Sequence, residues 1–92
     1  MAVPSRRLND LDASIAKALI LTPWAQHDIA ALFGCNPGRI AEIATGQAFE
    51  ATPAADLSTE RARARLAELQ NAWVLRIARQ LSQVLRPHGA LL

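Results

Sequence analysis

The stretch that decides the fold is QHDIAALFGCNPGRIAEIAT, residues 26–45. Its apolar residues recur at helical spacing on both sides of Gly34, which predicts two short helices joined by a turn. Glycine adopts the left-handed conformation without steric cost, so Gly34 is expected to end the first helix. Asn36 followed by Pro37 is typical of a capping residue and the first residue of the next helix. Gly46 is expected to close that second helix.

Six residues of this stretch have the types and spacing of a known motif. A small residue, Ala30, stands where two helices would cross closely, and Gly34 follows four residues later at the turn. The full set is Ile29, Ala30, Phe33, Gly34, Ile40 and Ile43. It resembles the helix-turn-helix of the lambda-repressor and Cro superfamily of small prokaryotic and phage regulators. The resemblance implies a DNA-binding core whose second helix enters the major groove. An ordinary helical hairpin in a bundle is the alternative.

The resemblance also implies which residues would contact double-stranded DNA. Gln26 resembles the family's glutamine that contacts backbone phosphate. With Ile40 and Ile43 facing inward, Arg39 could bind a guanine or a phosphate, and Glu42 could accept from a cytosine amino group. The candidate contacts in this stretch are Gln26, Asn36, Pro37, Gly38, Arg39, Ala41, Glu42 and Thr45. Plain solvation is the alternative for each of them.

Two features qualify this interpretation. Pro37 and Gly38 depart from the family, which usually has hydrogen-bonding side chains there, although both allow a close approach to the DNA backbone. Arg6 and Arg7, on the leading arm of residues 1–7, resemble the arms that other DNA-binding proteins place in a minor groove. A disordered terminus is the alternative for this arm.

A further helix is expected before the motif. Asn9 or Asp10 can cap it, and its apolar residues form one face: Leu8, Leu11, Ile15 and Leu19. Thr22 and Pro23 then have the pattern of a cap followed by proline, which predicts the start of the next helix there.

A long amphipathic helix is expected after the loop that begins at Gln47. Thr52 and Ser58 are both candidate caps, and no proline or glycine follows before Pro87, so roughly 28 to 34 residues are predicted helical. Its apolar stripe covers about half the circumference, wider than the ~100° of one helix-to-core contact. We therefore expect a homodimer interface that contains Leu66, Leu69, Trp73, Ile77, Leu81 and Val84. A helix packed only on its own core is the alternative.

The predicted fold class is all-α, because no segment alternates with a period of two. The expected organisation is a three-helix helix-turn-helix core followed by the long helix. The ranges are a flexible arm at 1–7, the core at 8–50, the long helix at 51–86 and a flexible tail at 87–92.

The distribution of charge weighs against a simple nucleic-acid module. Residues 57–92 carry six arginines and two glutamates, a net charge of +4, whereas residues 1–56 carry four basic and six acidic residues, a net charge of −2. A DNA-binding module usually carries the positive field itself. Arg65 and Arg76, beside the apolar stripe, could contact phosphate, pair with acids of residues 1–56, or be solvated.

Other classes of protein are disfavoured. One cysteine and two histidines make neither a disulfide nor a metal site, and no phosphate-binding glycine loop occurs, so we expect no cofactor and no enzyme. His27 and Asp28 are expected to point about 100° apart and so not to form an orienting pair for catalysis. Cys35 is expected to be a small packing residue. The apolar stretch 8–21 is interrupted by charges, so neither a signal peptide nor a membrane span is expected, and a cytoplasmic, nucleoid-associated location follows.

Two functions remain open. The first is a sequence-specific DNA-binding transcriptional regulator, repressor-like and homodimeric, which the motif spacing favours. The alternative is a protein-interaction module such as an antitoxin, adaptor or antirepressor that uses the basic last helix, which the charge of residues 1–56 favours. A phage packaging subunit is a third, weaker option.

Overall fold

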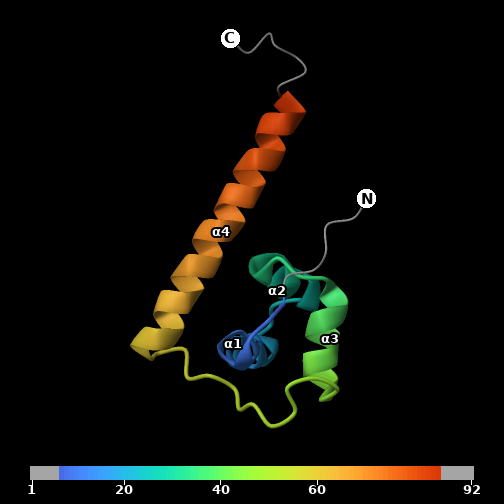
Figure 1. Ribbon diagram of the computed structural model, residues 1–92, viewed down its shortest axis with the longest axis vertical. Coiled ribbons are helices and arrows are strands. Elements are labelled where there is room, and N and C mark those ends of the chain that lie inside the picture. The colour runs from blue at the N-terminus through green and yellow to red at the C-terminus, as the bar shows by residue number, and fades with distance from the viewer. Residues whose placement is uncertain (1–6, 86–92) are drawn as a thin grey trace.

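A computed structural model describes residues 7–85 of the chain. This part consists of three short helices followed by one long helix (Figure 1): α1 (Asp10–Ile20), α2 (Gln26–Phe33), α3 (Pro37–Thr45) and α4 (Glu60–Leu85). No strand occurs between residues 7 and 85, so the all-α prediction and the predicted order of helices are confirmed. Arg6, Arg86 and the predicted tail lie outside the described residues.

The first helix, α1, is capped by Asn9, which is one of the two residues predicted for this role. The Asn9 side chain accepts a hydrogen bond of 2.8 Å from the backbone N–H of Asp12. The predicted cap at Thr22 is wrong, because α2 has Ala25 at its cap position and no side-chain cap. The Thr22 hydroxyl instead donates to the carbonyl of Leu19 over 2.5 Å, and its oxygen accepts from the N–H of Trp24 over 3.3 Å, in the turn that follows α1.

The turn between α2 and α3 forms as predicted. Gly34 adopts a left-handed conformation with φ of 70°, and the N–H of Cys35 donates to the carbonyl of Ala30 over 3.0 Å. The Asn36 side chain accepts from the N–H of Gly38 over 2.9 Å and caps α3. A second left-handed glycine, with φ of 82°, ends α3 at the predicted position. Local sequence therefore defines both boundaries of the turn.

The core lies where α1, α2 and α3 meet and is closed by the first half of α4. The motif residues predicted to face inward are all buried: Ile29, Ala30, Phe33, Ile40 and Ile43. From α1, Ala13, Ile15, Ala16 and Leu19 pack against them, and α4 adds Ala62 and Leu69.

The linker between α3 and α4 is held against α1, which it passes on its way to α4 (Figure 1). The ammonium group of Lys17 donates to the carbonyls of Phe49, at 2.5 Å, and of Thr52. The backbone N–H of Ala55 donates to the carbonyl of Ser14 over 2.8 Å. Lys17 thus holds the linker against α1 through two of its carbonyls, just before the linker leads into α4.

The last helix starts later than predicted. It begins at Glu60 and has 26 residues, and neither Thr52 nor Ser58 caps it. The backbone N–H and the hydroxyl of Ser58 both donate to the Asp56 carboxylate, which lowers the pKa of Asp56. Thr59 caps instead, since its hydroxyl oxygen accepts from the N–H of Ala62 over 3.3 Å. Ser58 lies one residue before the capping position, in a turn that its N–H and hydroxyl make with Asp56.

Two arginines fix α4 to the short helices. Arg65 makes a bidentate ion pair with Asp12, which is 2% exposed, through distances of 2.6 and 3.2 Å. That hydrogen-bonded carboxylate raises the pKa of Arg65. The Arg76 guanidinium donates to the carbonyls of Ala31 and Leu32, over 2.6 and 3.2 Å, at the end of α2. The sequence left three roles open for Arg65: contact with phosphate, pairing with an acid of residues 1–56, or solvation. In the structure Arg65 pairs with such an acid, Asp12.

A pair of glycine substitutions should measure how tightly Arg76 holds the turn. A Cβ added at Gly34 would lie 3.1 Å from the Arg76 Nη1 atom, whereas at Gly46 it would meet nothing within 4 Å. Both sites are left-handed, so Gly46→Ala should lower the unfolding free energy by about 1 kcal/mol through backbone strain alone. Gly34→Ala should cost about 1 kcal/mol more, because the charged hydrogen bonds of Arg76 are displaced. Urea denaturation gives both values, and equal losses would show that Arg76 moves aside freely.

Candidate nucleic-acid interface

One side of α3 is turned away from the core and carries most of the predicted contacts. Ile40 and Ile43 are buried against α1 and α2. The residues left on the outer side are exposed or half-buried: Asn36, Pro37, Gly38, Arg39, Ala41, Glu42 and Thr45. The helical periodicity of the sequence was sufficient to separate these two sides.

Arg39 and Glu42 form an ion pair on that outer side. Arg39 Nη1 lies 3.3 Å from Glu42 Oε1, one turn further along α3. Both side chains are partly exposed, and surface pairs of this kind contribute roughly 0–1 kcal/mol. Such a pair separates at little cost, so the Arg39 guanidinium is available to a phosphate or a base edge.

The structure joins the start of α3 to the segment that precedes α1. Arg7, Asn36, Arg39 and Glu42 line one open groove of about 460 Å³. Its apolar lining comes from Leu8, Ala48 and Phe49. Arginines from two distant parts of the chain therefore border one concave surface. Sequence reasoning did not find the part played by the linker residue Phe49, which has a left-handed backbone with φ of 54°.

Two other predicted contacts lie elsewhere. Gln26 is the first residue of α2 and is exposed, but it does not line the groove at the start of α3. Thr45 ends α3 and lines a separate hollow with Lys17 and Ile20. Its hydroxyl donates back to the carbonyl of Ala41 over 3.1 Å. The predicted set is therefore spread along the outer side of α2 and α3 rather than gathered at one point.

Cys35 lies in the turn between α2 and α3. Partial burial raises the pKa of the Cys35 thiol, with the nearby Arg39 charge acting against this shift. Cys35 packs against the core, as expected. His27 and Asp28 come closer than the expected angle between them suggests, with His27 Nε2 3.3 Å from Asp28 Oδ1. Both side chains reach into solvent, where their flexible torsions bring them together despite the angle between their Cα–Cβ bonds.

The predicted dimer-interface residues fall into two groups along α4. Leu69, at 1% exposed, is buried in the core of its own chain, and Leu66 is partly buried against that core. The remaining four are exposed: Trp73, Ile77, Leu81 and Val84. The first part of the stripe is thus occupied within the chain, and the second part is open.

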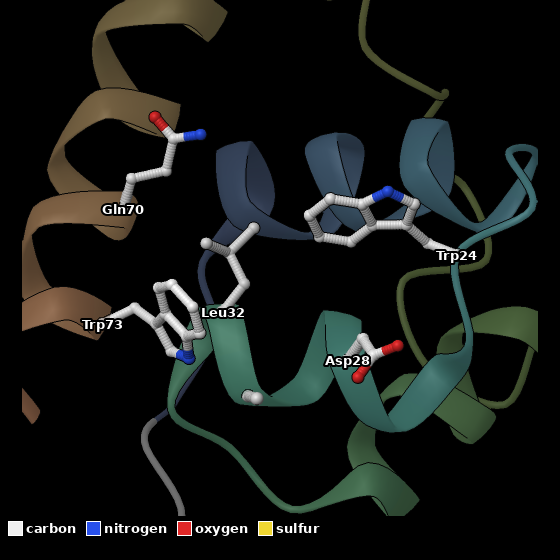
Figure 2. A pocket seen from close by; sticks show the side chains of 6 residues that line it. Trp24, Asp28, Leu32, Gln70 and Trp73 are labelled. Carbon is white, nitrogen blue, oxygen red and sulfur yellow. The ribbon is translucent and has the colours of Figure 1, made fainter. Parts of the chain in front are cut away.

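Sequence reasoning missed an apolar groove that both tryptophans line. A groove of about 280 Å³ lies between α2 and α4 and is lined by Trp24, Asp28, Ala31, Leu32, Gln70 and Trp73 (Figure 2). The signal in the sequence was an unassigned tryptophan just before the second helix.

Among residues 7–85, no three histidine, cysteine or acidic side chains are placed to hold a metal ion. Within the same residues no helix has the length and apolar character needed to span a bilayer. Comparison with protein-family models, with curated proteins and with solved structures finds no significant match for this chain.

Proposed function

We propose that the chain is a sequence-specific DNA-binding transcriptional regulator, repressor-like and homodimeric, with α2 and α3 as its helix-turn-helix. The observation that carries the proposal is the packing of the motif. Its five apolar residues are buried and Gly34 is left-handed, while the outer side of α3 stays open to solvent. This is the combination that a recognition helix needs. We assign the protein a binding role and no catalytic one, at the nucleoid of a prokaryotic cell.

The groove at the start of α3 supports a particular mode of contact. Arg39 would leave Glu42 and bind a guanine edge or a phosphate, and Asn36 would lie nearest the DNA backbone. Arg7 borders the same groove, so the residues before α1 would follow the duplex beside α3.

The ion pair between α1 and α4 weakens the objection from charge. Residues 1–56 have a net charge of −2, but Arg65 and Arg76 of α4 lie against the short helices. Together the two arginines offset that charge, and Asp12 is covered by its partner. The folded helix-turn-helix unit is therefore less acidic than its own stretch of sequence.

DNA titrations with two variants of α3 test the proposal. We expect binding to weaken as salt rises, because phosphate contacts release counterions. Arg39→Ala should lower affinity by about 1–3 kcal/mol and relax the preference at one base pair if Arg39 contacts a base. The measurement is fluorescence anisotropy with a library of duplexes at low and high salt.

Glu42→Gln is the matched control, since it removes the partner of Arg39 and keeps the shape of the side chain. It should tighten binding by removing a charge that phosphate repels. An equal loss for every duplex in Arg39→Ala would make Arg39 a phosphate contact only. Failure of the wild-type chain to bind any duplex at low salt would exclude the regulator.

A protein-interaction module is the second candidate, and one observation favours it. Trp24, Trp73 and the apolar residues that follow along α4 expose a hydrophobic surface at the upper end of what a small monomer leaves in water. An antitoxin, adaptor or antirepressor would use this surface without DNA. The candidate predicts that the chain binds no duplex but is captured by a protein through α4.

A further inference from the structure

The groove between α2 and α4 is lined by the two tryptophans of the chain. Trp24 comes from the segment before α2 and Trp73 from α4, and they lie on either side of Leu32 (Figure 2). Trp24 is 51% exposed and Trp73 is 41% exposed. Two half-exposed indoles beside a leucine make an apolar hollow that is open to an apolar ligand or side chain.

The exposed apolar stripe of α4 continues from this groove. Ile77, Leu81 and Val84 follow Trp73 at steps of four, four and three residues, so all four lie on one side of the helix. This half of α4 extends beyond the three short helices (Figure 1). The stripe therefore runs from a concave aromatic end to a convex aliphatic end.

The exposed stripe shares only part of its direction with the side of α4 that faces its own core: Leu66, five turns before Val84 and in line with it, packs against that core. Ala62, Leu69 and Arg76 contact the short helices, and on that same side Gln80 and Gln83 come next. The exposed stripe lies roughly a quarter of a turn away from this line. Polar residues thus follow on the core-facing line where the core ends, and Ile77 and Leu81 point away from that line.

We propose that a second copy of the chain covers this face, with the two α4 helices antiparallel and Ile77 near the two-fold axis. Leu81 and Val84 of each chain then fill the groove between Trp24 and Trp73 of the other. The inference rests on the homodimer of the proposed function and does not depend on DNA binding.

The positions of the residues along α4 favour the antiparallel arrangement. Trp73 and Leu81 are each four residues from Ile77, about 6 Å along the axis in opposite directions. A two-fold axis at Ile77 therefore places each Leu81 opposite the partner chain's indole and fills both grooves at once. A parallel pair would place the two Trp73 side chains together and leave both grooves empty.

The area and charge of the face suit a second copy. The exposed parts of Trp24, Trp73, Val74, Ile77, Leu81 and Val84 amount to roughly 600 Å² per chain, so two faces approach the ~1,200 Å² of a small specific interface. The arginines do not oppose pairing: Arg76 is hydrogen-bonded to the end of α2, and Arg79 lies on the far side of α4 from the stripe. Two identical basic helices can therefore meet through this side.

Disulfide trapping tests the arrangement. In a Cys35→Ala background, which removes the one native cysteine, Trp73→Cys and Leu81→Cys chains are mixed and oxidised. The antiparallel pair should give mainly the mixed disulfide, because only that combination brings the two Cβ atoms close enough to bridge. Predominant Trp73→Cys and Leu81→Cys homodisulfides would show a parallel pair and overturn the proposal.

A matched pair of charge substitutions tests the face without cysteine. Leu81 is 56% exposed on the stripe and Leu75 is 57% exposed on the opposite side of α4. Leu81→Glu should weaken the dimer at least about 100-fold by burying an unpaired carboxylate. Leu75→Glu should change it by less than about threefold, as a surface substitution does. Sedimentation equilibrium measures both, and circular dichroism confirms that each variant keeps its helix content.

The outcomes separate this inference from the DNA proposal. A wild-type chain that sediments as a monomer at tens of micromolar overturns the inference and leaves the groove to residues 86–92 of the same chain or to another protein. Equal weakening by Leu75→Glu and Leu81→Glu overturns it as well. A dimer trapped as described that binds no duplex refutes only the DNA proposal. A monomer that binds duplex refutes this inference and the homodimer of the proposed function, and leaves DNA binding standing.

Discussion

Leu69→Glu is expected to unfold the chain, whereas Leu81→Glu on the same helix leaves it folded. Leu69 is 1% exposed and packs in the core. A buried carboxylate without a partner costs several kcal/mol, and loss of the leucine packing adds about 2–5 kcal/mol. Small domains have only about 5–15 kcal/mol of stability in total. Circular dichroism and urea denaturation should show most of the native state lost in Leu69→Glu.

Leu69→Met is the matched control, since it keeps the volume of the side chain and should cost less than about 1.5 kcal/mol. If Leu69→Glu retained wild-type stability, Leu69 would not be a core residue. The division of α4 into a core-facing half and an open half would then be wrong.

The second large effect is expected from Asp12→Ala, which should lower the unfolding free energy by about 3 kcal/mol. Removing the buried carboxylate leaves the Arg65 guanidinium, whose side chain is 24% exposed, without its main partner. Glu68 lies 3.4 Å from Arg65 on the solvent side and compensates only in part. The expected loss therefore lies at the lower end of the range for broken buried pairs.

A double-mutant cycle gives the control for this pair. Asp12→Leu combined with Arg65→Met replaces both charges by apolar groups and should be far less costly than Asp12→Ala, because no charge is left unpaired. Denaturation curves for Asp12→Leu, for Arg65→Met and for the double variant measure the coupling energy between the two side chains. A loss below about 1 kcal/mol in Asp12→Ala would show that water reaches the pair and replaces the carboxylate.

The sequence predicted helix ends correctly where the capping residue interacts only with the backbone beside it. Gly34, Asn36 and Gly46 define the ends of α2 and α3 because their effect depends on the backbone beside them. Thr22 and Ser58 did not cap a helix because each is held in a local turn: the Thr22 oxygen accepts from the N–H of Trp24, and the N–H and hydroxyl of Ser58 donate to Asp56. Such turns between adjacent polar groups are not visible in a residue pattern.

Contacts between distant parts of the chain could not be predicted in the same way. The pair between Asp12 and Arg65 spans 53 residues, and nothing near either residue specifies it. The groove that unites Arg7 with the start of α3 depends on the path of the linker, which Lys17 fixes by binding carbonyls. Both features require the three-dimensional arrangement of the helices.

The sequence predicted the width of the apolar stripe of α4, but it did not predict which residues of the stripe pack on the chain's own core and which are exposed. A stripe over half the circumference indicates two contacts. The structure shows that the core-facing residues and the exposed ones follow one another along the helix, with the change near Trp73. Sequence periodicity gives the angle of each residue around the axis and does not give the point at which the core ends.

The placement of the tryptophans has a spectroscopic consequence. Trp24 and Trp73 are the only tryptophans of the chain, which has no tyrosine, and both line the groove between α2 and α4. The near-ultraviolet emission of the unlabelled protein therefore originates almost entirely from this one small area. Its wavelength reports whether water or apolar side chains surround the indoles, so occupancy of the groove can be followed without attaching a dye.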